Sequence, residues 1–148
     1  MSDKNAIAED DVLVTVALLR TARVAAQAVD DALAADNLNV DHYLVLDTLA
    51  ERPGVTMAVL RDRTRIPAPT LTRVVDRLVS IAAAYREVDA DDRRKVRVHP
   101  SARGRQLHAR LSATVRDAEQ AWLGDVPDSG SADRVGNLAA LLAGRLDA

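Results

Sequence analysis

Apolar residues recur at helical spacing over most of the chain. Between Asp11 and about Ala35, valine and leucine return every three or four positions, with no glycine or proline to interrupt them. This spacing predicts an amphipathic helix. Further helices are predicted between Asp41 and Arg52, over 57–63, from Thr70 to about residue 82, from Ser101 to about residue 124 and over 132–146. We therefore expect about six helices.

One region breaks this period. Residues 85–88 and 95–98 alternate apolar and polar positions, which is typical of β-strands. The segment between them, 89–94, consists almost entirely of aspartate and arginine. The pattern predicts a two-stranded β-hairpin with a charged tip. The expected fold class is therefore mainly α with one hairpin.

Residues that favour helix ends support these boundaries. Asp41, Thr56 and Ser101 are expected N-caps, because their side-chain oxygens can accept hydrogen bonds from the free N–H groups of a first turn. Pro69 suits the start of the next helix, where its missing N–H costs nothing. For that helix we expect a buried face of Leu71, Val74, Val75 and Leu78 and an exposed face of Thr72, Arg73, Asp76 and Arg77.

Length and composition limit the classes of protein that fit. The chain has 148 residues, of which 48% are hydrophobic, and it contains neither cysteine nor phenylalanine. It is long enough for one compact domain with an aliphatic core. The lack of cysteine excludes disulfides, thiolate metal sites and a cysteine redox switch. The longest strongly apolar stretch, 12–19, is too short to span a membrane, and no signal peptide is evident. We expect a cytoplasmic protein.

Charge is unevenly distributed along the sequence. Residues 61–110 carry a net charge of +7, whereas the rest of the chain carries −9. A basic centre within an acidic protein is what a polyanion-binding surface needs. The alternative is a solvated arginine-rich face, and charge alone does not separate the two.

The order of the central elements favours DNA. A short helix, a tight turn, a second helix and a β-hairpin form a winged helix-turn-helix, whose second helix fits the major groove. Arginine can donate two hydrogen bonds to guanine, and threonine can contact phosphate or a thymine methyl. The hairpin arginines can reach phosphates or a minor groove, with Asp91 or Asp92 orienting one of them. The DNA-binding candidates are Thr56, Thr70, Thr72, Arg73, Arg77, Arg93, Arg94 and Lys95.

Three segments carry a family resemblance. The runs 69–78 (PTLTRVVDRL), 91–95 (DDRRK) and 101–107 (SARGRQL) resemble the MarR family of bacterial transcription regulators. The resemblance implies an obligate homodimer that binds a pseudo-palindromic operator, usually as a repressor, and releases it when a small, often aromatic or phenolic, ligand binds. By position, Arg73 matches a base-contacting residue and Arg93 the wing arginine of the minor groove.

The sequence departs from that family at two turns. Arg65 and Ala82 stand where family members usually carry glycine, at turns that often need a positive φ. These departures are the only support for a second hypothesis, a winged-helix module that binds a ligand or protein and has weakened DNA contacts. A small enzyme is a third hypothesis.

The outer helices are expected to form a dimer. Apolar positions such as Val16, Leu19, Leu138 and Leu142 form stripes that a monomer leaves exposed, and pairing across a two-fold axis buries them. The alternative is an intramolecular bundle. The expected organisation is a DNA-binding lobe over 38–100 and a dimerisation region over 10–36 and 101–148.

The sequence gives less support for ligand-binding or catalytic residues than for DNA-binding residues. In the family, ligands lie between the dimer helices and the DNA-binding lobe. Arg20, Arg23, His42, Tyr43 and Trp122 are the polar or aromatic residues available for such a crevice, although ordinary surface or core roles suit each of them. The three histidines lack metal-ligand spacing, and no phosphate-binding glycine loop or nucleophile turn is present. We therefore expect no metal, cofactor or catalytic residue.

Overall fold

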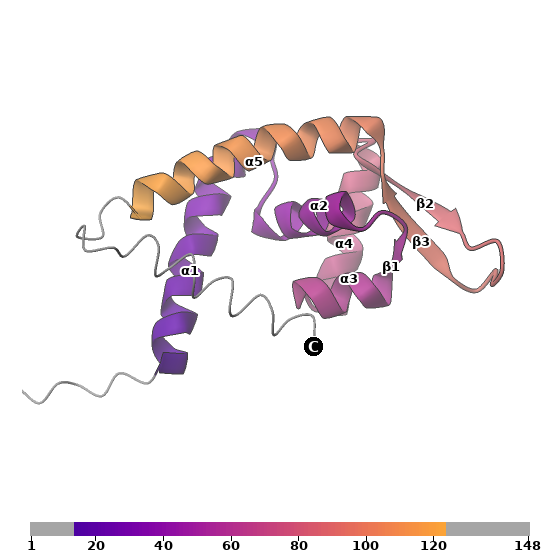
Figure 1. The fold of residues 1–148 in the computed structure, drawn as a ribbon, viewed down its shortest axis with the longest axis horizontal. Helices are drawn as coiled ribbons and strands as arrows, with labels where there is room; N and C mark the ends of the chain where they lie inside the picture. The colour runs from indigo at the N-terminus through magenta and orange to yellow at the C-terminus, as the bar shows by residue number, and fades with distance from the viewer. Residues whose placement is uncertain (1–13, 124–148) are drawn as a thin grey trace, which may run out of the picture.

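The computed structural model describes residues 14–123 (Figure 1). The first residues of the helix predicted from Asp11, and the whole helix predicted over 132–146, lie outside the described residues. The elements follow the order α1 (Val14–Leu33), η1 (Ala34–Asp36), α2 (Val40–Glu51), β1 (Val55–Thr56), α3 (Met57–Thr64), α4 (Ala68–Ser80), β2 (Ala84–Val88), β3 (Val96–Pro100) and α5 (Ala102–Leu123). The mainly α winged helix-turn-helix is confirmed.

The start of α2 differs from the prediction. The N-cap is Asn39 and not Asp41, which lies inside the first turn. The Asn39 side chain accepts a hydrogen bond from the His42 backbone N–H, and the Asn39 N–H donates to His42 Nδ1 at 3.2 Å. This reciprocal capping box satisfies two donors at once. Asn39 and Asp41 are both good N-cap residues, so residue type alone does not decide between them.

The helix-turn-helix follows the predicted pattern closely. Thr56 caps α3, with its side chain accepting from the Val59 N–H. Helix α4 begins two residues before the predicted Thr70, and Pro69 occupies its first turn. Its buried residues are the predicted Leu71, Val74, Val75 and Leu78.

The sheet has three strands rather than the two predicted. Strands β2 and β3 pair antiparallel, with Tyr85 opposite His99, and the two-residue strand β1 pairs with the other edge of β3. Two residues cannot show an alternating pattern, so β1 was missed. The hairpin projects from the helical body as a wing (Figure 1).

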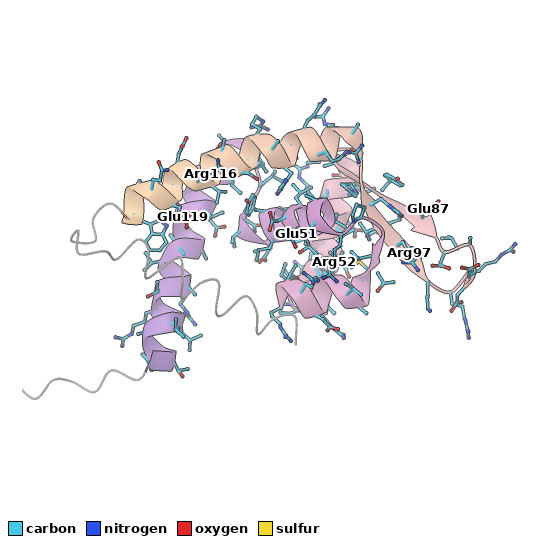
Figure 2. The ribbon with its side chains drawn as sticks, in the orientation of Figure 1. Glu51, Arg52, Glu87, Arg97, Arg116 and Glu119 are labelled. Atoms are coloured by element: carbon cyan, nitrogen blue, oxygen red, sulfur yellow. The ribbon has the colours of Figure 1, made fainter. Side chains whose placement is uncertain are left out.

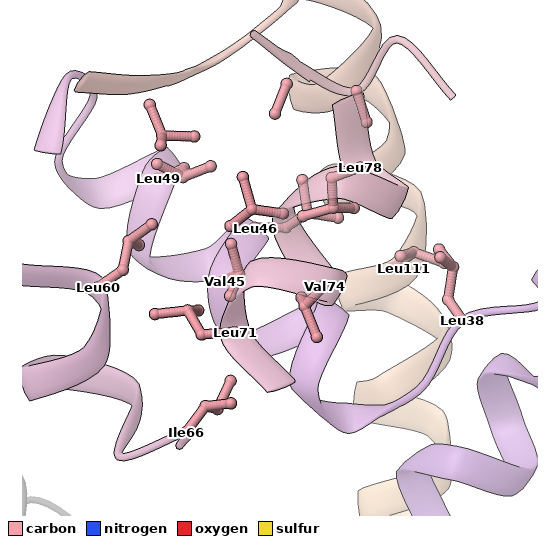
Figure 3. Packing of buried hydrophobic residues seen from close by; sticks show 14 of the residues in the cluster. Leu38, Val45, Leu46, Leu49, Leu60, Ile66, Leu71, Val74, Leu78 and Leu111 are labelled. Atoms are coloured by element: carbon pink, nitrogen blue, oxygen red, sulfur yellow. The ribbon is translucent and has the colours of Figure 1, made fainter. Parts of the chain in front are cut away.

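An aliphatic core joins the lobe together. Figure 3 shows side chains from α2, α3, α4 and α5 meeting in one cluster. Leu46, Leu49, Leu60 and Leu78 are among its fully buried members, and Leu111 extends the cluster into α5. These contacts hold α4 and the base of the wing in fixed positions.

Helix α5 begins tightly against the wing. Ser101 caps it as predicted, accepting from the Gly104 N–H at 2.9 Å. A Cβ on Gly104 would lie 1.8 Å from the Ala83 carbonyl oxygen, so only glycine permits this approach. Among residues 14–123, no helix is both long and apolar enough to cross a membrane.

Candidate nucleic-acid interface

The outer face of α4 presents cationic and hydroxyl groups to solvent. Thr72, Arg73 and Arg77 are exposed, directly opposite the buried leucines and valines. Within residues 14–123, the side chains of Arg73 and Arg77 make no hydrogen bond or ion pair. Thr72 Oγ1 donates to the Ala68 carbonyl at 3.0 Å, which keeps its methyl group and an oxygen lone pair available. This face has the donors that base edges and phosphates accept from.

The first turns of α3 and α4 hold the other two threonines. Thr70 is partly buried in the first turn of α4. Thr56 uses its hydroxyl oxygen to cap α3, at 3.4 Å from the Val59 nitrogen. Its hydroxyl hydrogen is not used by that contact. A phosphate at this helix start can therefore accept from the hydroxyl and interact with the positive end of the helix dipole.

The two atypical turns adopt the conformation that glycine favours. Arg65 ends α3 with φ of 58°, and Ala82 follows α4 with the same φ. After α4, the Ala83 N–H donates to the Leu78 carbonyl at 2.8 Å, which is the hydrogen bond of a Schellman-type helix end. The turns therefore keep the expected geometry, and the cost is backbone strain at two non-glycine residues.

An ion pair fixes the wing to α4. Arg86 on β2 contacts Asp76 on the exposed side of α4, with 2.6 Å between Nη2 and Oδ1. A partly exposed pair of this kind adds little to stability. Its geometric effect is larger, because it sets the position of the hairpin relative to the helix that would enter the major groove.

The two arginines at the wing tip differ in their surroundings. Arg94 is held by Asp92, with Nε 3.3 Å from Oδ1, and Lys95 lies 3.9 Å from the same carboxylate. The Arg93 side chain is exposed and has no such partner among the described residues. The prediction that Asp91 or Asp92 orients one wing arginine is thus met by Asp92 and Arg94.

A buried carboxylate supports the wing tip, and the sequence analysis did not assign it. Asp89 accepts from the backbone N–H groups of Asp91 and Asp92, at 2.9 and 3.0 Å, and from Arg97 Nε at 2.5 Å. Chiefly through the Arg97 hydrogen bond, and then through the two N–H groups, the pKa of Asp89 falls to about 2. In the sequence Asp89 is one of three aspartates in a charged loop, so no signal marks it out.

Arg97 extends this support to the helical lobe. Its Nη1 donates to the Gly54 carbonyl at 2.9 Å, while the Gly54 N–H donates to the Val98 carbonyl at 3.0 Å. Figure 2 labels Arg97 on the wing strand nearest β1. Gly54 has φ of 77°, and a Cβ there would lie 2.7 Å from the His99 ring. We call Asp89, Arg97 and Gly54 the wing brace.

The five proposed ligand residues are placed on three helices, and contacts explain two of them, His42 and Tyr43. Arg20 and Arg23 are exposed on α1. His42 completes the α2 capping box, and Tyr43 stacks on His108 with 5.8 Å between ring centroids. Trp122 is partly buried on α5. None of the five lines the cavity of about 440 Å³ that opens beside α5.

The described residues hold no cluster of metal-binding side chains. Within residues 14–123, no group of three or more histidines, cysteines, aspartates or glutamates is placed so that it could hold a metal ion. His99 and His108 each face a single carboxylate, Glu87 at 3.0 Å and Asp47 at 2.9 Å. These pairs belong to the packing of the wing and of α2 against α5.

Comparisons with known proteins agree with this geometry. Residues 36–95, which include the helix-turn-helix and most of the hairpin, match the model of the MarR family. The comparison with curated proteins found no match.

Solved structures share the fold over almost the whole chain. A MarR family transcriptional regulator of Rhodococcus sp. RHA1 is 23% identical, with a TM-score of 0.77 over 88% of this chain and 91% of that one. A MarR family protein of Mycobacterium tuberculosis in complex with salicylic acid is 25% identical, with a TM-score of 0.75 over 89% and 98%. The repressor CouR of Rhodococcus jostii RHA1, bound to a 23-mer DNA duplex, is 21% identical, with a TM-score of 0.75 over 88% and 92%.

Proposed function

We infer that the chain is a transcriptional regulator of the MarR family and acts as a homodimeric, operator-specific DNA-binding protein; the family model over residues 36–95 and the shared fold of the solved structures support this. Its proposed role is that of a cytoplasmic repressor at a pseudo-palindromic operator, released by a small-molecule effector. The solved structure of CouR on a DNA duplex and that of a relative with salicylic acid support both binding functions by analogy. No catalytic role is proposed.

One observation carries the DNA-binding proposal. The outward face of α4 holds Arg73 and Arg77 without partners among residues 14–123, and the Arg86–Asp76 pair fixes that helix to an arginine-tipped wing. A stable fold does not require unpaired arginines on the one helix face that fits a major groove. A DNA duplex supplies guanine edges and phosphates that can accept hydrogen bonds from these arginines.

Each proposed contact has a distinct role. Arg73 reads base edges in the major groove, and Arg77 contacts the groove or its phosphates. Thr56, Thr70 and Thr72 contact the backbone or base edges near the helix starts. At the wing, Asp92 orients Arg94 for contact with a phosphate, while Arg93, which has no partner among the described residues, is the candidate for the minor groove and Lys95 supplies further charge.

The test is binding to duplex fragments from the chromosomal neighbourhood of the gene, measured by fluorescence anisotropy at several salt concentrations. Wild type is compared with Arg73→Ala, Arg94→Ala and the control Arg116→Ala, an exposed arginine on α5. We expect wild type to bind one fragment selectively. Arg73→Ala should weaken the free energy of that binding by about 1–3 kcal/mol. Arg94→Ala reduces the slope of log K against log salt by about 0.9, the contribution of one phosphate contact. The control Arg116→Ala should leave both the affinity and the salt slope unchanged.

A negative result has a defined meaning. If folded, dimeric wild type binds no fragment selectively, the repressor proposal is wrong. The alternative is then a winged-helix module that binds a ligand or protein, with the turns at Arg65 and Ala82 as the first features to examine.

A further inference from the structure

A small crevice opens between α3 and α4. Its base includes Leu71, which is buried and belongs to the same core cluster as Leu60 of α3 (Figure 3). Its volume is about 220 Å³, below the range of about 300–1,000 Å³ that small-molecule sites usually have. The crevice therefore suits a single chemical group better than a whole small molecule. Its lining residues are Met57, Ala58, Arg61, Ala68, Leu71 and Thr72.

Most of the lining side chains are apolar. Met57 and Ala58 come from α3, and Ala68 and Leu71 come from α4. Thr72 Oγ1 donates its hydrogen to the Ala68 carbonyl at 3.0 Å, so the hydroxyl has no hydrogen left to donate to a phosphate. Thr72 offers a ligand a methyl group and an oxygen lone pair. The crevice is therefore complementary to an apolar group.

Arg61 adds a positive charge to this apolar surface. Its side chain is 55% exposed, and its Nη2 lies 3.6 Å from Oδ1 of the adjacent Asp62, which is also exposed. An ion pair between two solvated groups contributes little, so another anion can replace it. Arginine can pack its aliphatic part along an apolar surface while its guanidinium stays in water. Arg61 thus lines the crevice and keeps its guanidinium accessible.

The major groove of DNA presents an apolar group at only one kind of base. Every base edge there offers hydrogen-bond donors or acceptors, and thymine alone adds an apolar group, its C5-methyl. Ala68 and Thr72 lie in the first two turns of α4, the helix that we propose enters this groove. Phosphates run along the edges of the groove, where a cation on the adjacent helix α3 can contact them.

We propose that the crevice between α3 and α4 reads a thymine in each operator half-site. The C5-methyl packs against Ala58, Ala68 and Thr72, while Arg61 contacts a neighbouring phosphate. This inference rests on the proposed function and deepens it, because it names a base that the operator contains and assigns Arg61 to the DNA interface. The sequence analysis did not assign Arg61, because spacing alone does not place it beside Thr72.

The experiment removes the methyl group from the DNA and leaves the base pairing in place. In the duplex fragment that wild type selects, each thymine in turn is replaced by deoxyuridine, which lacks only the C5-methyl. Fluorescence anisotropy measures the affinity. We expect at least one thymine in each half-site at which this replacement weakens wild-type binding about threefold to fivefold, the effect of losing one buried methyl group.

Variants of the crevice show whether that methyl group lies in it. Ala58→Leu fills the crevice, so the loss of affinity on deoxyuridine replacement should disappear. Val59→Leu is the matched control, because Val59 is the next residue of α3, is exposed and does not line the crevice; it should keep the full loss. Thr72→Ser removes the methyl group of the protein and keeps the hydroxyl, so it should reduce the loss even where Ala58→Leu binds too weakly to measure. Thermal melts confirm that the variants are folded.

The phosphate contact has a separate readout. Arg61→Gln should lower the slope of log K against log salt by about 0.9, the contribution of one phosphate contact. Arg116→Gln, an exposed position on α5, should leave the slope unchanged. An unchanged slope in Arg61→Gln would show that Arg61 does not contact a phosphate.

Two results overturn the thymine subsite while the proposed function stands. The first is selective operator binding with no loss of affinity when any thymine is replaced by deoxyuridine. The second is a loss that neither Ala58→Leu nor Thr72→Ser reduces, which would place the methyl contact elsewhere on the protein. If folded wild type binds no fragment selectively, the proposed function and this inference are both wrong.

Discussion

At the scale of single residues, Ala82 has a backbone conformation that glycine adopts at much lower cost. Its φ is 58° and its side chain is exposed, so removing the methyl group loses no packing. We expect Ala82→Gly to raise the free energy of unfolding by about 0.5–1 kcal/mol, since relief of left-handed strain exceeds the added freedom of the unfolded chain. Urea denaturation measures the change.

The matched control is the same substitution inside a helix. Ala113 is exposed within α5, and Ala113→Gly is expected to lower the free energy of unfolding by about 1 kcal/mol. If both substitutions destabilise equally, the turn at Ala82 does not carry the strain that its φ indicates.

His42 gives the fold a pH dependence near neutrality. Burial lowers the pKa of its imidazole below the ordinary value of 6.5, and Arg77 lowers it further, while Asp41 and Asp30 raise it. A depressed histidine pKa means that the unfolded chain binds the proton more readily. The contribution of neutral His42 to the free energy of unfolding is therefore fully present well above pH 6.5. It is lost as the pH falls below 6.5, where the unfolded chain takes up the proton first.

The variant that tests this is His42→Gln, because glutamine can keep the capping box without titrating. We expect the free energy of unfolding of wild type to fall more between pH 7.5 and 5.5, about one unit either side of the free imidazole value, than that of His42→Gln. His99 and His108 are unchanged in the variant, so their contributions cancel in the comparison. Parallel pH profiles would show that His42 titrates normally.

At the scale of elements, the wing is positioned by hydrogen bonds within the protein. Arg97 joins Asp89 at the wing tip to Gly54 beside β1. We expect Arg97→Lys to weaken operator binding about tenfold, because an ammonium cannot donate in two directions with the guanidinium's fixed geometry. The slope of log K against log salt stays unchanged, since lysine keeps the positive charge. Operator binding by Arg97→Lys as tight as that of wild type would show that the fixed geometry of the guanidinium does not position the wing.

The elements also show what the sequence can and cannot predict. The two faces of α4 follow from spacing alone, because a 3.6-residue period separates Leu71 and Val75 from Arg73 and Arg77. The wing brace cannot be predicted from spacing, because one of its hydrogen bonds joins Arg97 to Gly54, which is 43 positions earlier in the sequence. The same limit applies to β1, which exists only because β3 lies beside it, and to the cavity beside α5, where segments distant in sequence meet.

At the scale of the whole molecule, α1 exposes apolar side chains that a dimer interface needs. Leu19 is 60% exposed and Val24 is 58% exposed, on a helix that packs along α5. Within residues 14–123 these side chains gain little from folding, since most of their apolar surface stays in water. A second copy of the chain can cover them by two-fold pairing, which also places two α4 helices against the two halves of a palindromic operator.

The prediction is that Leu19→Glu converts the dimer to a monomer and lowers operator affinity by at least about a hundredfold, because a monomer contacts only one half-site. Sedimentation velocity gives the oligomeric state, and anisotropy with full and half operators gives the affinities. Leu44→Glu is the matched control, since Leu44 is 37% exposed on α2 within the DNA-binding lobe. It should remain dimeric. If Leu19→Glu stays dimeric, the dimer uses another surface. If it becomes monomeric yet binds the full operator as tightly as wild type, operator binding does not depend on the two-fold assembly.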